Sequence, residues 1–507
     1  MTVHIDVART IATINPALHG HFVEFLGECI DGGIWVGPES TVPNTGGVRT
    51  AVIEALRELE PPIIRFPGGC YADTYHWRDG IGPREQRPTT FNENFGTFEL
   101  DDHGFGTDEF LQLCETVGAE AWLNVNTMSG SVAEMRDWME YVNREQGTSL
   151  TAERAANGHA KPYDVQRWGI GNEPWAGGGN MTARGYAELY RAYASAMPRF
   201  TAGILEPSRV LPIAAGPDGN KPLERVRWTQ DFFAALAEYR VPPLGGYDIH
   251  FYNWNIGHDG DTSETFEREG WDRLIAGSLE LEEVILEQHR LVREGLAALP
   301  APESDFFSAE PTIDLVVGEW GNWHGDAFAA RPALRQQVTM RDAITTALTL
   351  DVLQRNADKV SMACNAQLVN VLNALLLTEG EHTVRTANFD VFMMYKAHRG
   401  AQALEVSGAP EGVHVFASLG EDGALTIDLV NADLDGARQV ELSFADPTEL
   451  LEIENLAADE PTACNTFERP DAIRRCVSRL DRAAATAHSV TLPGGSVSVL
   501  RARAVGV

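Results

Sequence analysis

Residues 315–323 read LVVGEWGNW, an apolar run that ends in a carboxylate, Glu319, followed by tryptophan, glycine and asparagine. A second stretch, residues 167–175, reads RWGIGNEPW and places Glu173 in nearly the same context. Each run has the length and composition of a short buried strand. A carboxylate at a buried strand end costs desolvation free energy unless it is partnered or used. One such glutamate is most simply a salt-bridged strand end, but two in matching contexts indicate a catalytic pair.

Short apolar runs alternate with helical patterns along residues 18–390. The candidate strands cover residues 20–24, 63–66, 121–125, 168–171, 211–215, 247–250, 315–319 and 360–363. Each is followed by a candidate helix, at residues 48–59, 107–117, 132–143, 182–197, 225–239, 279–298, 334–355 and 366–377. Thr107 and Thr182 precede helical apolar periods and are predicted N-caps. Eight strands, each followed by a helix, predict an α/β fold of the (β/α)8 TIM-barrel type.

Unusual polar residues fall just after these strands rather than before them. They include Glu24, Cys70, Asn172, His250 and Gln367. A barrel builds its active site at the carboxyl ends of its strands. A doubly wound open sheet would gather its site at one switch point and use fewer strands. The distribution therefore favours the barrel.

After about residue 395 the pattern changes to short stretches in which apolar and polar residues alternate. Turn signals such as GEDG at residues 420–423 separate them. Such stretches predict a C-terminal β-sandwich, jelly-roll-like, which the N-terminal strand at residues 3–14 joins. We therefore assign residues 18–390 to a catalytic barrel, and residues 1–17 plus 391–507 to a β-sandwich domain.

Composition restricts the partners. The chain has 507 residues and a formal net charge of −33, which repels nucleic acid and anionic membranes. We expect no nucleic-acid or membrane partner, and the N-terminus lacks the pattern of a secretory signal. The six cysteines are scattered, without a CxxC pair or zinc-type spacing. They are interpreted as reduced thiols of a cytoplasmic protein.

Cleavage of a glycosidic bond needs two carboxylates, one proton donor and one nucleophile. Asn172, beside Glu173, can hydrogen-bond a sugar 2-OH, although an asparagine here is more often a turn former. His250 and Tyr252 share one face of a strand and can hold a nucleophilic glutamate ionised. A packed, hydrogen-bonded pair explains these two residues equally well.

Arg65 and Cys70 lie in one glycine-rich turn and have structural interpretations. Arg65, in the glycine-rich turn that ends in Cys70, is expected to form a salt bridge that anchors this turn, and no base is identifiable beside the thiol.

A metal-dependent hydrolase would need clustered His and Asp ligands at strand ends, where only His250 stands. We therefore expect no metal and no cofactor. A catalytically dead carbohydrate-binding protein would have lost a carboxylate, and both are present.

The chain resembles glycoside hydrolase family 51, the α-L-arabinofuranosidases, through nearly its whole length. The matching motifs are GGIWVG at 32–37, PGGCYAD at 67–73, HWRDGIGPR at 76–84, FGTDEF at 105–110, GNE at 171–173, GGNMT at 178–182, EW at 319–320, AQLVNVL at 366–372 and residues 392–395. The resemblance implies a (β/α)8 barrel with a β-sandwich, and a homo-oligomer, trimer or hexamer. It implies exo release of terminal α-L-arabinofuranosyl units from a furanosyl-containing oligosaccharide.

The resemblance also implies roles for single residues. Glu173 corresponds to the acid/base and Glu319 to the nucleophile of a retaining mechanism. The residues implied to contact the substrate are Glu24, Cys70, Asn172, Tyr252 and Gln367. The chain departs from its relatives around the sugar subsite, for example at Phe25 and at residues 253–255. β-D-Galactofuranoside and β-D-xyloside therefore remain alternative substrates for the same mechanism.

Overall fold

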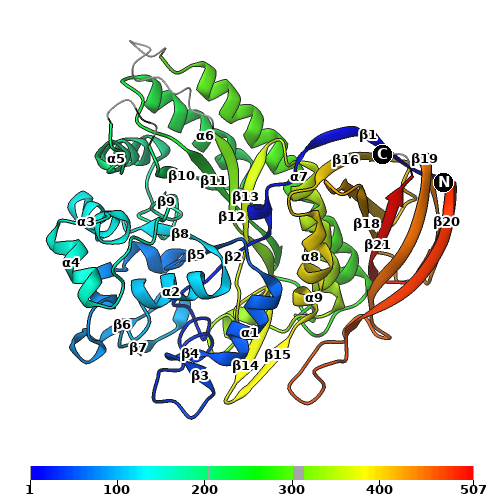
Figure 1. Ribbon diagram of the computed structural model, residues 1–507, viewed down its shortest axis with the longest axis horizontal. Coiled ribbons are helices and arrows are strands. Elements are labelled where there is room, and N and C mark those ends of the chain that lie inside the picture. Colours follow the sequence, from blue (N-terminus) through cyan, green and yellow to red (C-terminus); the bar gives the residue numbers. More distant parts are fainter. Residues whose placement is uncertain (1, 204–205, 207, 301–312, 506–507) are drawn as a thin grey trace. The chain divides into compact units, whose positions relative to one another are not determined.

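The computed structural model describes residues 2–203, 206, 208–300 and 313–505. Within these ranges, eight strands form a closed barrel in chain order. Figure 1 labels these strands. They are β2 (Gly20–Phe22), β5 (Ile63–Phe66), β8 (Glu120–Val125), β9 (Arg167–Ile170), β10 (Leu211–Asp218), β11 (Gly246–Asn255), β12 (Asp314–His324) and β13 (Val360–Asn365). Neighbours from β2 to β11 pair in parallel. The predicted (β/α)8 barrel is confirmed.

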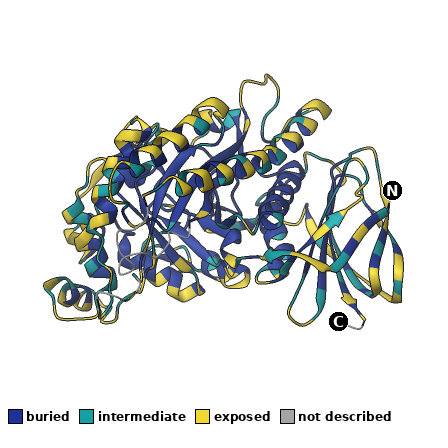
Figure 2. Ribbon diagram, turned by 90° about the horizontal axis from the view of Figure 1, so that it is seen from above, coloured by how far each residue is buried: buried dark blue, intermediate teal, exposed yellow. Residues whose placement is uncertain are grey.

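Helices follow the barrel strands along the chain. They are α1 (Thr50–Leu59), α2 (Thr107–Val117), α3 (Val132–Asn143), α4 (Ser149–Ala156), α5 (Ala183–Ala196), α6 (Pro222–Ala237), α7 (Arg268–Ala297), α8 (Met340–Arg355) and α9 (Ala387–Tyr395). The strands are buried, and most of the surrounding helices are exposed on one side, as Figure 2 shows. Helix α1 illustrates the cause, because its buried Val52, Leu56 and Leu59 recur at the helical period.

Helix α5 fixes the strand end from which Glu173 extends. Tyr186 donates its hydroxyl hydrogen to Ile170 O, the last residue of β9, and accepts a bond from Ala215 N of β10, each at 2.7 Å. One turn later, Tyr190 donates to Pro243 O at 2.8 Å. These buried bonds satisfy polar groups that would otherwise destabilise the core. The two Tyr186 bonds hold the carboxyl end of β9 beside β10.

Two local expectations need correction. The predicted helix over residues 366–377 is absent, because Asn370 and Leu372 adopt left-handed backbone angles (φ 60° and 51°) that a right-handed helix excludes. The Asn370 side chain instead accepts from Thr378 N at 2.7 Å and thereby stabilises a turn. Thr182 is the N-cap of α5 as predicted. Thr107 is not a cap, because α2 begins at Thr107 itself and Gly106 precedes it.

The C-terminal part of the described chain contains a seven-stranded sheet. Its order is β1 (Thr2–Thr13), β16 (Gln402–Ser407), β17 (Val413–Leu419), β18 (Ala424–Asn431), β21 (Ser496–Ala504), β19 (Arg438–Ala457) and β20 (Arg474–Leu492). Strand β1 pairs antiparallel with β16 and parallel with β19, so the sheet folds around a core that includes Ile5, Ile427 and Leu442. The N-terminal strand thus joins the C-terminal sheet, as predicted.

Short two-stranded hairpins lie between the larger elements. They are β3 (Asn44–Thr45) with β4 (Val48–Arg49), β6 (Thr90–Asn92) with β7 (Glu99–Asp101), and β14 (Leu376–Glu379) with β15 (His382–Arg385). By contacts, the chain divides into two compact units. One comprises residues 20–251 and 286–319, and the other comprises residues 1–19, 252–285 and 320–507. In the described part of the chain, no helix is long and apolar enough to cross a membrane.

Candidate active site

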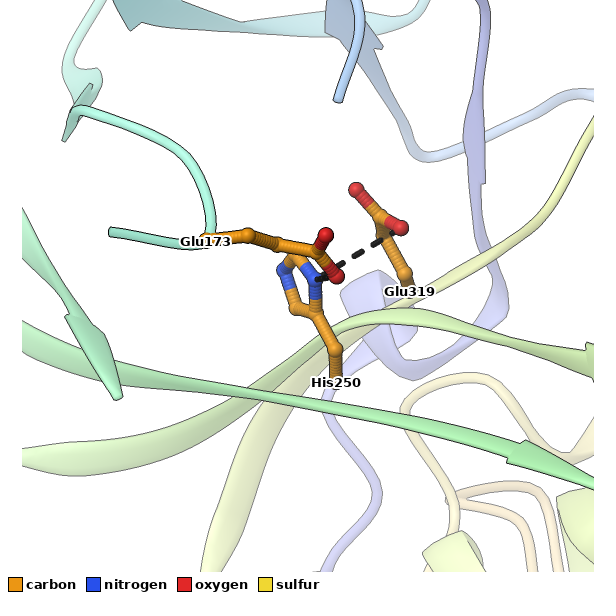
Figure 3. A group of neighbouring side chains, drawn as sticks. All are labelled: Glu173, His250 and Glu319. Atoms are coloured by element: carbon orange, nitrogen blue, oxygen red, sulfur yellow. Dashed lines mark hydrogen bonds and ion pairs between the residues drawn. The ribbon is translucent and has the colours of Figure 1, made fainter. Parts of the chain in front are cut away.

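The two predicted carboxylates meet within the unit of residues 20–251 and 286–319. Glu173 follows β9, Glu319 lies on β12, and His250 lies between them on β11, as Figure 3 shows. One ligand atom from each of these three side chains lies within 4.8 Å of the other two. Glu173 has a positive φ of 39°, a conformation that costs about 1 kcal/mol or more. The site is thus built from three neighbouring barrel strands: Glu173 follows the end of β9, while His250 and Glu319 lie within β11 and β12.

Arg65 binds Glu319 and Asn172 at the same time. Its Nη1 lies 2.7 Å from Glu319 Oε1, and its Nη2 donates to Asn172 Oδ1 at 2.6 Å. The guanidinium is fully buried and packs over the rings of Phe22 and Trp122. A buried guanidinium next to a carboxylate favours the ionised carboxylate. Because Arg65 occupies the amide oxygen of Asn172, this asparagine presents its NH2 group to the site.

His250 contacts carboxylates through both ring nitrogens. Its Nδ1 lies 2.9 Å from Glu173 Oε1 and 3.5 Å from Glu319 Oε2. Its Nε2 lies 3.2 Å from Asp248 Oδ2. A ring between carboxylates on both sides is most stable when both nitrogens carry hydrogen, which is the imidazolium form. His250 therefore supplies a positive charge between the glutamates.

The surroundings raise the pKa of Glu173 and the pKa of His250 for different reasons. Burial raises the pKa of Glu173, and the charge of Glu319 adds to this rise, while the bond from His250 opposes it. Burial alone would lower the pKa of His250, but Glu319 and Asp248 outweigh burial and raise it to about 10. A carboxyl with a raised pKa suits a general acid near neutral pH. Glu173 has this property.

Cys70 and Glu24 line the same site. Cys70 Sγ lies 3.9 Å from Glu173 Oε2 and 3.9 Å from Asn172 Nδ2. Burial, followed by the charge of Glu173, raises the pKa of Cys70, so its thiol stays neutral and is not an activated nucleophile. Glu24 Oε1 accepts from Tyr71 N and from Asn94 Nδ2, each at 3.0 Å. Polar groups thus approach the glutamates from several strands.

The glycine pair of the turn after β5 allows this close approach. A Cβ on Gly69 would lie 2.7 Å from Glu319 Oε1, and one on Gly68 would lie 2.4 Å from Glu24 Cγ. Both distances are shorter than real Cβ contacts. Gly68 also has a φ of 151°, which favours glycine. The two glycines of PGGC are thus required by the space beside Glu24 and Glu319.

Six of the predicted site residues come together in this unit, and two belong to the other unit. Those that lie together are Glu24, Cys70, Asn172, Glu173, His250 and Glu319. Tyr252 packs edge-on against Trp323, with the ring centroids 5.1 Å apart. Gln367 is buried, and its backbone N–H donates to Val371 O at 3.1 Å. Substrate contact by Tyr252 and Gln367 stays a prediction.

Sequence reasoning missed Asp248 entirely and gave Arg65 only the role of a turn anchor. Arg65 does form a salt bridge, but to Glu319, which is 254 residues away in the chain. The residues near Arg65 in the sequence do not indicate that Glu319 is its partner. For Asp248 a signal existed, because Asp248 and His250 are two residues apart on one strand and so point to the same face.

Glu173, His250 and Glu319 are also close enough to hold a metal ion. The protonation of the group argues against this use. Arg65 already neutralises Glu319 at 2.7 Å, and an imidazolium has no lone pair for a metal. The donor set suits proton transfer better than metal binding.

Comparison with known proteins agrees with this geometry. Residues 55–268 match the alpha-L-arabinofuranosidase 1 domain, and residues 318–496 match the alpha-L-arabinofuranosidase C-terminal domain. The chain is 34% identical to an intracellular exo-alpha-L-arabinofuranosidase of Bacteroides ovatus, over 99% of this chain and 95% of that protein.

Solved structures with the same fold cover the chain almost completely. The GH51 arabinofuranosidase of Xanthomonas axonopodis pv. citri has a TM-score of 0.88 and 31% identity, over 99% of this chain and 100% of that one. The Thermotoga maritima alpha-L-arabinofuranosidase in complex with arabinose has a TM-score of 0.82 and 25% identity, over 99% of each chain.

The pKa of Glu173 gives a first test. His250→Gln keeps a donor toward Glu173 but removes the positive charge, so the pKa of Glu173 should rise further. If Glu173 acts as the acid, the alkaline limb of the kcat/KM profile moves to higher pH, by about one unit. The control His159→Gln, which alters a hydrogen bond with Glu115 away from the two catalytic candidates, should leave the profile unchanged. A downward shift in His250→Gln would contradict the electrostatic assignment.

Proposed function

Because the chain belongs to the α-L-arabinofuranosidases of glycoside hydrolase family 51, we propose that it hydrolyses furanosides by double displacement, with Glu173 as acid/base and Glu319 as nucleophile. The observation that carries the proposal is the spacing of the two glutamates, which have oxygens within 4.8 Å of each other. Retaining enzymes place their carboxyl groups about 5–5.5 Å apart, whereas inverting enzymes leave about 6.5–9.5 Å for a water molecule.

In the first step Glu319 attacks the anomeric carbon while Glu173 protonates the leaving oxygen. Arg65 and His250 favour the ionised form of Glu319, and burial favours the protonated form of Glu173 by raising its pKa. The C–O bond to the aglycone breaks, and a glycosyl ester forms on Glu319. The NH2 group of Asn172 is placed to hydrogen-bond the sugar 2-OH, a contact that strengthens in an oxocarbenium-like transition state.

In the second step Glu173, now ionised, removes a proton from the incoming water. The water oxygen bonds to the anomeric carbon, the ester to Glu319 breaks, and both glutamates return to their starting protonation states. His250 contacts both glutamates. Its positive charge stabilises the Glu319 anion before the first step and the Glu173 anion before the second. Two displacements on the same carbon give net retention of configuration.

The substrate that the site suits best is a terminal α-L-arabinofuranosyl unit of an arabinose-containing oligosaccharide, released in exo fashion. Support comes from the relatives, which are named for this activity, and from Glu24, Cys70 and Asn172, which approach from different strands. Polar groups that converge from several sides enclose one small ring and reject a sugar that leaves one of them unpaired.

The protein is further proposed to act in the cytoplasm as a homo-oligomer, a trimer or hexamer. A relative named intracellular and the free cysteines support the location. The exposed apolar side chains of Phe91, Phe98 and Leu100 on the β6–β7 hairpin provide surface of the kind that subunit contacts bury. Light scattering coupled to size-exclusion chromatography measures the assembly, and a monomer at micromolar concentration would contradict it.

The roles of the glutamates can be separated with azide. Glu173→Ala should retain activity on aryl glycosides with good leaving groups and lose it on poor ones, because only the latter need the acid. Azide should restore turnover and give a glycosyl azide of retained configuration, since it attacks the ester on Glu319. In the matched Glu319→Ala variant, azide should give the inverted product. Equal loss on all leaving groups without azide rescue would sink the assignment of Glu173.

The glycone can be tested with three aryl glycosides. The kcat/KM for the α-L-arabinofuranoside should exceed that for the β-D-galactofuranoside and the β-D-xyloside by tenfold or more, because each alternative leaves site groups unpaired. If the galactofuranoside or xyloside leads instead, the substrate assignment fails while the mechanism stands. Release of internal fragments from an arabinan, seen by chromatography, would contradict the exo mode.

A further inference from the structure

We propose that Asp248 is a positioning residue of the reaction, which holds His250 as an imidazolium between the two glutamates and fixes the strand segment before Glu319. This inference rests on the proposed roles of Glu173 and Glu319. The Asp248 carboxylate binds His250 and the N–H of Gly318, and it has no place in the bond-making steps. Its effect on the reaction passes through the two groups that its carboxylate binds.

One oxygen of the Asp248 carboxylate binds His250. Oδ2 lies 3.2 Å from His250 Nε2, and the opposite ring nitrogen lies 2.9 Å from Glu173 and 3.5 Å from Glu319. When Glu173 is protonated, Glu319 remains an anionic acceptor on that side. Asp248 supplies the anionic acceptor on the other side, so the ring has an acceptor at each nitrogen throughout the cycle.

The other carboxylate oxygen binds the strand that carries Glu319. Asp248 Oδ1 accepts from Gly318 N at 2.7 Å, directly before Glu319. The approach is possible only because residue 318 lacks a side chain, since a Cβ there would lie 2.4 Å from Oδ1. A carboxylate that accepts a buried N–H and a histidine N–H has both oxygens satisfied. Asp248 therefore ties β11 to β12 beside the site.

The charges around His250 decide what the imidazolium does. Within the described unit, the titratable and charged groups close to the ring and to its carboxylate partners come from several elements: Glu24 after β2, Arg65 on β5, Asp73 after β5, Glu173 after β9, Asp218 on β10, Asp248 on β11 and Glu319 on β12. Arg65 is committed to Glu319 and Asn172. His250 is thus the cation that hydrogen-bonds Glu173, and its charge opposes the effect of burial on that acid.

Asp248→Asn separates charge from shape. The amide oxygen can still accept from Gly318 N, while the amide NH2 then faces His250 Nε2 and requires this nitrogen to be an acceptor. The ring should become neutral, keeping hydrogen only on Nδ1. In ¹⁵N NMR, wild-type His250 is expected to show an imidazolium at pH 8, and the variant a neutral ring. The alkaline limb of kcat/KM should move up by about one pH unit, as the cation next to Glu173 is lost.

A double mutant tests whether Asp248 acts through His250. In the His250→Gln background, Asp248→Asn should cause no further shift of the limb. The control Asp108→Asn alters another buried carboxylate, which accepts from Tyr141 at 2.7 Å and Tyr163 at 3.0 Å, and should leave the limb unchanged. A shift of similar size in this control would mean that general loss of stability moves the profile.

Three results would overturn the proposal. They are a neutral His250 in the wild type at pH 8, an imidazolium that survives Asp248→Asn, and a limb that still shifts in the double mutant. The first needs no variant, so it decides even if Asp248→Asn fails to fold. Failure of the proposed function would appear separately, as absence of azide rescue in Glu173→Ala, while the NMR result would still report on Asp248.

Discussion

The proximity of two buried carboxyl groups is the constraint on which the site depends. Two full negative charges within 4.8 Å of each other repel by roughly 3 kcal/mol or more at an effective dielectric constant of about 20. Arg65 relieves this repulsion on one side of Glu319, and His250 relieves it between the two residues. The remaining effect of burial falls on Glu173, which has a raised pKa. The division into an acid and an anion thus follows from where the cations lie.

The barrel could be predicted from the sequence because each strand and helix carries its own local signal. Apolar runs of strand length alternate with helical periods such as Val52, Leu56 and Leu59. The strand-end rule then placed Glu173 and Glu319 in one site without any knowledge of distances. Strand β19, Arg438–Ala457, is longer than the short stretches that the alternation predicts, because three exposed residues at 445–447 interrupt its pattern.

What the sequence could not supply were contacts between distant residues and turns that override an apolar pattern. The partner of Arg65 follows only from the closed barrel, because β5 and β12 are far apart in the chain. The apolar stretch 366–377 resembles a helix, yet Asn370 makes it a turn through its own side-chain bonds. In both cases a side-chain contact that the local apolar pattern does not contain decided the structure.

The contact between Asp248 and Gly318 couples the substitutions that are possible at two positions far apart in the chain. Any side chain at 318 would collide with the carboxylate, and a shorter residue at 248 would leave the N–H of Gly318 buried without that acceptor. A side chain at 318, or a residue at 248 without an acceptor oxygen, therefore requires a compensating change at the other position or a water in place of the lost oxygen. The pair limits the evolutionary paths open to the residue directly before Glu319, although neither member reacts with the sugar.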